Sequence, residues 1–136
     1  MLEKYIEGMT TEKAVRMAME KSGAKNRAEA MEYLRKSIPK ESYFQKKIKD
    51  ALAKKYPQAY VAKIAQGYYS YSGIPDIMFI MDGRYFGFEV KRPIFGKASA
   101  IQEQTIIKLR EAGAVAEVVS YPEEAIKVVD DWIWKE

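Results

Sequence analysis

The chain has 136 residues, 48% of them hydrophobic and 31% charged, which is typical of one soluble globular domain. It contains no cysteine and no histidine, so disulfides, thiolate chemistry and Cys/His zinc sites are excluded, and any metal must take oxygen ligands, as Mg²⁺ and Mn²⁺ do. No apolar run approaches the ~20 residues that cross a bilayer and no signal peptide opens the chain, so we expect a cytoplasmic protein without a membrane partner.

The N-terminal part of the sequence predicts two short helices. The first covers residues 10–22 and ends at Gly23. The second begins after Asn26, which forms a capping pattern with Glu29. We interpret residues 1–37 as a helical extension and assign it no chemistry.

A third helix is expected over residues 39–55, with Pro39 in its first turn. Its apolar positions repeat every four residues, at Phe44, Ile48 and Leu52. Glu41 lies close to this apolar face. A glutamate there indicates either a charged partner or a first-turn residue favoured by the helix dipole, and the sequence leaves both open.

The rest of the chain alternates strands and helices. Three strands joined by short connections predict an antiparallel meander, and a helix then leads by crossover into a fourth strand. The last helix begins at Pro122 and should turn Ile126, Val129, Trp132 and Ile133 inward. We therefore predict an α/β fold, a mixed sheet flanked by helices, in a domain over residues 38–136. The expected strands are 59–69, 76–81, 84–91 and 114–120, and the expected helix between the last two is 99–111.

Two carboxylates should face each other on one hairpin. Asp82-Gly83 is a strong signal for a two-residue turn, which fixes the register of the flanking strands. Counting back from this turn places Asp76 opposite Glu89, with Cβ atoms about 4.5–5.5 Å apart. Lys91 follows two residues after Glu89 and shares its face of the sheet.

Opposed carboxylates repel each other unless one is protonated or a cation bridges them. Hard divalent cations bind such pairs, and a neighbouring lysine can neutralise charge on a phosphate. This pattern indicates hydrolysis of a phosphodiester. The alternative is a surface ion cluster in which Lys91 pairs with Glu89. The lysine-rich segment 35–63 is compatible with nucleic acid, although such a run is also typical of a solvated helix face.

Pro75-Asp76 followed by Glu89-Val90-Lys91 resembles the signature of the PD-(D/E)xK nucleases. The wider pattern, which adds Gln102 and the apolar strand after its helix, resembles the VRR-NUC family over about residues 38–130.

This resemblance implies a restriction-endonuclease-like fold and Mg²⁺- or Mn²⁺-dependent cleavage of DNA. Stand-alone members of the family, often phage-borne, are homodimeric Holliday-junction resolvases. It therefore implies branched DNA as the substrate, a homodimer, and a bacterial or phage-infected host cell. Cleavage of flap, nicked or linear duplex DNA, or binding of DNA without cleavage, are the alternatives.

The resemblance also implies a metal site. Asp76 and Glu89 would be the metal ligands, helped by the main-chain carbonyl of Val90. Glu41 would hold the metal directly or through water.

Two further residues of the motif complete the implied active site. Lys91 would be the catalytic lysine, and Gln102 would support this lysine or the attacking water. Outside the motif, hydroxyl and cationic side chains could contact DNA phosphates. These candidates are Ser72, Lys63, Arg92 and Lys97.

Overall fold

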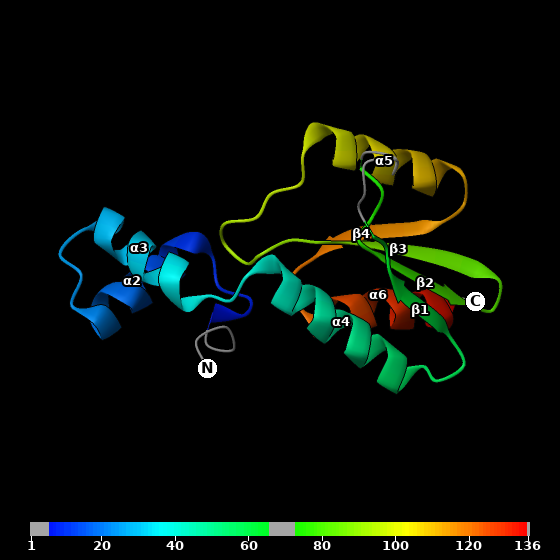
Figure 1. Ribbon diagram of the computed structural model, residues 1–136, viewed down its shortest axis with the longest axis horizontal. Coiled ribbons are helices and arrows are strands. Elements are labelled where there is room, and N and C mark those ends of the chain that lie inside the picture. Colours follow the sequence, from blue (N-terminus) through cyan, green and yellow to red (C-terminus); the bar gives the residue numbers. More distant parts are fainter. Residues whose placement is uncertain (1–5, 66–72, 136) are drawn as a thin grey trace.

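The computed structural model describes residues 6–65 and 73–135, and it forms a four-stranded sheet with helices on both faces (Figure 1). This arrangement confirms the predicted α/β fold. The helices are α2 (Thr11–Ser22), α3 (Arg27–Ser37), α4 (Glu41–Lys55), α5 (Ala100–Glu111) and α6 (Pro122–Lys135). The strands are β1 (Tyr60–Lys63), β2 (Ile77–Met81), β3 (Arg84–Val90) and β4 (Val115–Val119).

The sheet has the predicted topology. The strand order is β1-β2-β3-β4, with β1, β2 and β3 antiparallel and β4 parallel to β3 after the α5 crossover. Met81 pairs with Arg84 around the Asp82-Gly83 turn. Both turn residues have positive φ, 53° and 77°, as the favoured two-residue hairpin turn requires. The register that the turn predicted is therefore confirmed along β2 and β3.

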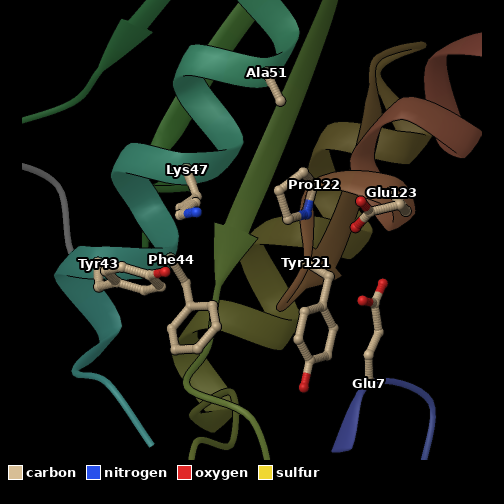
Figure 2. Close-up of a pocket in the computed structure, with 8 residues that line it drawn as sticks. All are labelled: Glu7, Tyr43, Phe44, Lys47, Ala51, Tyr121, Pro122 and Glu123. Carbon is tan, nitrogen blue, oxygen red and sulfur yellow. The ribbon is translucent and has the colours of Figure 1, made fainter. Parts of the chain in front are cut away.

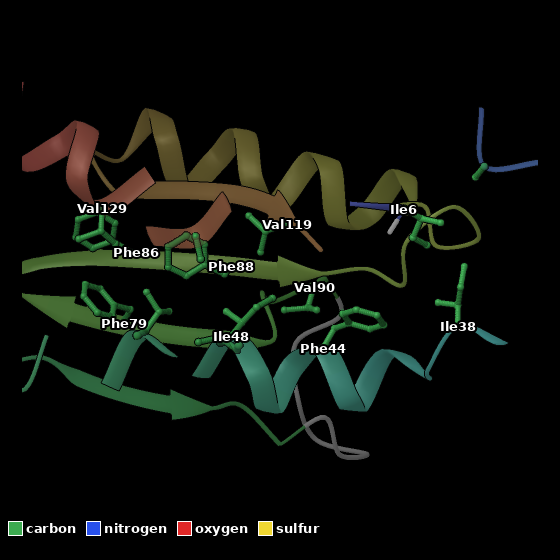
Figure 3. Packing of buried hydrophobic residues seen from close by; sticks show 14 of the residues in the cluster. Ile6, Ile38, Phe44, Ile48, Phe79, Phe86, Phe88, Val90, Val119 and Val129 are labelled. Atoms are coloured by element: carbon green, nitrogen blue, oxygen red, sulfur yellow. The ribbon is translucent and has the colours of Figure 1, made fainter. Parts of the chain in front are cut away.

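A core of aromatic side chains lies between the sheet and the helices α4 and α6, and α5 covers the opposite face (Figures 1 and 3). Phe79 of β2 and Phe86 and Phe88 of β3 are fully buried. The rings of Phe79 and Phe86 meet edge to face with centroids 5.2 Å apart. This core fixes β3, the strand that carries Glu89.

Three elements differ from the prediction. Helix α4 begins at Glu41 because Lys40 has an extended backbone, so Pro39 precedes the helix. Strand β1 ends at Lys63 rather than at 69; residues 64–65 are not in a strand, and 66–72 lie outside the described residues. Ile133 was expected to be inward but is 40% exposed, because the buried face of α6 runs through Ala125 and Val129.

The N-terminal helices form as their end signals predict. The side chain of Asn26 accepts a hydrogen bond from the Glu29 amide (2.9 Å) at the start of α3. Gly23 ends α2 in the left-handed conformation, φ 73°.

No described helix is long and apolar enough to span a membrane. The boundary between residues 37 and 38 stays a prediction.

Arg92 ties the N-terminal helices to the end of β3. Its guanidinium donates to the carbonyls of Pro39 (3.0 Å), Ile38 (2.7 Å) and Arg35. The same group lies 4.8 Å from the centre of the Phe95 ring. The carbonyls that end α3 are thus satisfied by a residue next to Lys91 in the chain.

Replacing Arg92 with alanine should lower the free energy of unfolding by about 2–3 kcal/mol, because the partly buried carbonyls lose a charged donor. Arg92→Lys should recover only part of this loss, since an ammonium cannot donate in a fork. Urea unfolding measures both. Arg27→Ala, which removes an exposed ion pair with Glu12, is the control and should cost less than about 1 kcal/mol. Equal losses for Arg92→Ala and Arg27→Ala would contradict the assigned role.

Candidate active site

The predicted catalytic residues meet at the end of the sheet where β3 finishes and where α4 and α5 begin (Figure 1). Asp76 directly precedes β2, Glu89 is the penultimate residue of β3, and Lys91 follows it. Glu41 is the first residue of α4, and Gln102 lies in the first turn of α5. Residues distant in sequence are thus gathered by the hairpin and by two helix N-termini.

The two carboxylates of the hairpin are buried. Asp76 is 8% and Glu89 1% exposed. A carboxylate oxygen of Asp76, Oδ2, accepts a hydrogen bond from the backbone N–H of Val90 (2.8 Å), and its carbonyl accepts one from Ile64 (2.7 Å). Asp76 is therefore held against the main chain next to Glu89, which confirms that the hairpin brings the two acids together.

The two carboxylate oxygens of Glu89 differ, because one accepts a hydrogen bond from a described residue and the other does not. The side-chain amide of Gln102 donates to Oε1, and the ammonium of Lys91 lies 3.7 Å from the same atom. The other oxygen, Oε2, is buried with no hydrogen-bond partner among the residues described. Because an unsatisfied buried carboxylate oxygen is costly, this atom indicates a ligand or a proton at the site.

Gln102 is held at both ends of its side chain. Its Oε1 accepts from the backbone N–H of Ser99 (2.9 Å), while the Ser99 hydroxyl accepts from the backbone N–H of Gln102 (3.2 Å). This capping box starts α5 and aims the Gln102 amide at Glu89. The family resemblance implied that Gln102 supports the lysine or the attacking water; in the structure its side-chain amide contacts the carboxylate of Glu89.

Burial and, next in size, the neighbouring carboxylate of Asp76 together raise the pKa of Glu89 to about 8, against the attraction of Lys91. Burial also raises the pKa of Glu41, against the attraction of Lys91. The site therefore favours a bound positive charge, because either a proton or a cation relieves the repulsion between its acids.

Glu41 has the charged partner that the sequence left open. Its Oε1 lies 3.9 Å from the Lys91 ammonium, whose side chain is only 15% exposed. The amide of Gln45 lies 3.5 Å from the other oxygen, Oε2. Lys91 thus lies between the carboxylates of Glu41 and Glu89.

Gln45 was not predicted as a site residue. It is 7% exposed, which is unusual for a glutamine. Its spacing of four residues from Glu41 on a helix was the signal in the sequence.

The chemistry of the donors fits a hard divalent cation. Asp76 and Glu89 offer two neighbouring carboxylates with an unbonded buried oxygen, and Mg²⁺ is commonly held by one or two carboxylates with water and phosphate. Across residues 6–65 and 73–135, no three acidic side chains gather into a metal-binding group. The side chains of Asp76, Glu89 and Glu41 therefore do not by themselves form the three-carboxylate metal site that was predicted.

The predicted phosphate contacts have different environments. Lys63 lies at the end of β1 and lines a groove with Glu41 and Asp76. Lys97 is exposed in the connection between β3 and α5. The guanidinium of Arg92 donates to main-chain carbonyls of Ile38 and Pro39, and a phosphate contact at this residue stays a prediction. Ser72 lies outside the described residues.

A second, more apolar pocket of about 290 Å³ lies between α4 and the start of α6 (Figure 2). None of the predicted catalytic residues lines it. Phe44 and Tyr121 pack edge to face beside it, with centroids 5.9 Å apart. The residues around it are Glu7, Tyr43, Phe44, Lys47, Ala51, Tyr121, Pro122 and Glu123.

Comparison with solved structures confirms the expected resemblance. The chain is similar to a VRR_NUC domain, with 26% identity and a TM-score of 0.52, over 66% of this chain and 94% of that one. It also matches Hjc, a Holliday junction resolvase from the archaeal hyperthermophile Archaeoglobus fulgidus, with 26% identity and a TM-score of 0.43, over 59% and 67% of the two chains. No family model and no curated protein matches the sequence.

Proposed function

We propose that this protein is a divalent-metal-dependent DNA endonuclease that hydrolyses phosphodiester bonds, in branched DNA such as a four-way junction. The observation that carries the proposal is the buried pair Asp76 and Glu89, with Lys91 and Gln102 in contact with Glu89. The similarity to a VRR_NUC domain supports it.

In this proposal the carboxylates of Asp76 and Glu89 and the carbonyl of Val90 hold Mg²⁺ or Mn²⁺, and Glu41 supports the cation from α4. The bound cation supplies activation of the attacking water and neutralisation of charge on the phosphate. The protein has no histidine, so other side chains must stabilise the developing charge and position the metal ligands.

Lys91 has a defined part in this site. Its ammonium is held between two carboxylates and stays partly exposed, so it can contact a phosphate oxygen. There it stabilises the negative charge that develops during attack. Gln102 positions Glu89, because its own amide oxygen is fixed by the N-cap of α5.

The choice of branched DNA and of a homodimer rests on the family resemblance and on symmetry. A four-way junction has two-fold symmetry, and paired cuts need two active sites related in the same way. A homodimer of this chain satisfies that requirement.

The test compares an end-labelled four-way junction, a flap, a nicked duplex and a linear duplex, each with Mg²⁺, Mn²⁺ or EDTA. We expect symmetric cuts near the centre of the junction with either metal and none in EDTA. Equal cutting of linear duplex would keep the nuclease and remove the junction preference. Binding without a cut under every metal would overturn the enzymatic function and leave a DNA-binding protein.

A further inference from the structure

A groove leads away from the catalytic residues along α4. It consists of two adjoining hollows of about 510 and 550 Å³, which share Gln45 and Lys63 in their walls. The first is also lined by Glu41 and Asp76. The second continues past Lys49 toward the middle of α4. The groove therefore connects the candidate active site with a lysine-lined surface.

The charge along this groove changes from negative to positive. The acids Glu41 and Asp76 lie at its catalytic end. Farther along, Lys46 is neutralised by Asp50, with 2.7 Å between Nζ and Oδ2. Lys49 and Lys63 form no ion pair within 4.0 Å with another described residue. These two ammonium groups are available to an anionic ligand.

The spacing suits successive phosphates of one strand. Lys49 follows Glu41 by eight residues on α4, which is about 12 Å along the helix axis. One strand of B-DNA advances about 3.4 Å per nucleotide, so this length corresponds to roughly three to four nucleotides. Lys63 lies in the wall that both hollows share.

We propose that Lys49 and Lys63 form a phosphate-binding subsite that holds the backbone of the DNA strand on one side of the cleaved bond. This inference rests on the proposed nuclease function, because the catalytic end of the groove defines where the scissile phosphate lies and therefore on which side of it the subsite binds. The subsite positions the strand through its charge and does not read its bases.

The test measures binding of a labelled four-way junction and of linear duplex in EDTA, as a function of potassium chloride. For Lys49→Gln/Lys63→Gln we expect the slope of log K against log salt to become shallower by about 1.4–1.8, because each lost phosphate contact removes about 0.7–0.9. Lys49→Arg/Lys63→Arg should retain the wild-type slope.

The matched control is Lys108→Gln/Lys127→Gln, which removes the same charge from α5 and α6, outside the groove. Its slope should stay close to that of the wild type. A slope for Lys49→Gln/Lys63→Gln equal to that of this control would overturn the subsite. Circular dichroism of all variants confirms that they are folded.

The outcomes also separate this subsite from the nuclease function, which is measured by cleavage with metal. If the wild-type protein cuts no DNA but its salt slope depends on Lys49 and Lys63, the proposed subsite stands and the proposed nuclease activity is wrong. If the wild-type protein cuts the junction while the salt slopes of Lys49→Gln/Lys63→Gln and the control variant are equal, the proposed nuclease activity stands and the proposed subsite is wrong. Absence of any DNA binding would overturn both.

Discussion

Replacing Asp76 with asparagine is expected to reduce DNA cleavage by about a thousandfold or more, because a metal carboxylate is lost and such a ligand contributes several kcal/mol to the transition state. The fold should survive. The asparagine carbonyl can still accept the hydrogen bond that Asp76 takes from the Val90 amide. Alanine could not, and the buried N–H left behind would cost about 1–3 kcal/mol.

The measurement is single-turnover cleavage of the four-way junction, with urea unfolding on the same samples. Asp82→Asn is a matched control, since it makes the same chemical change at the turn of the same hairpin, where asparagine also accepts a positive φ. It should keep wild-type cleavage. Near-wild-type cleavage by Asp76→Asn would mean that the buried acids are a structural ion cluster.

Lys91→Ala provides the second arm of this experiment. It removes the positive charge between Glu41 and Glu89, so cleavage should fall while metal binding strengthens or stays unchanged. Loss of cleavage in Asp76→Asn together with wild-type cleavage in Lys91→Ala would keep the metal site and remove the lysine from the mechanism.

The central hairpin could be predicted from sequence because its information is local. Asp82-Gly83 dictates the turn, the turn dictates the register, and the register brings Asp76 to Glu89. Side chains alternate along a strand, so Phe86 and Phe88 must lie on the face opposite to Glu89, and both are buried in the core. No contact from elsewhere in the chain was needed for either conclusion.

The side-chain partners depended on tertiary structure. The partner of Glu41 is Lys91, the residue that follows β3 and lies fifty positions later in the chain, so helix periodicity left it undecided. Arg92 was a candidate phosphate contact because it is cationic, yet in the structure its guanidinium donates to the carbonyls of Ile38 and Pro39, just after α3. The sequence shows that a residue is cationic, but only the folded structure shows whether its N–H groups already donate hydrogen bonds to carbonyls of the same chain.

The free energy of unfolding of the metal-free protein should fall as pH rises from about 4.5 to about 8. In the folded protein the pKa of Glu89 is raised to about 8 by burial and by Asp76, whereas its ordinary value is 4.5. The folded state therefore binds the proton more tightly than the unfolded state across this range. The stabilisation is complete below about pH 4.5 and is lost as the pH passes the folded pKa. Its size is on the order of several kcal/mol.

Urea unfolding in EDTA between about pH 5 and pH 9 measures this loss. Glu89→Gln should flatten the profile, because the amide cannot ionise, and an exposed control on α5, Glu103→Gln, should retain the wild-type slope. Parallel profiles for wild type and Glu89→Gln would contradict a protonated Glu89. Added Mg²⁺ should stabilise the wild type more at pH 8.5 than at pH 6, because the cation replaces the proton between Asp76 and Glu89. Stabilisation that is equal at both pH values would place the metal away from this pair.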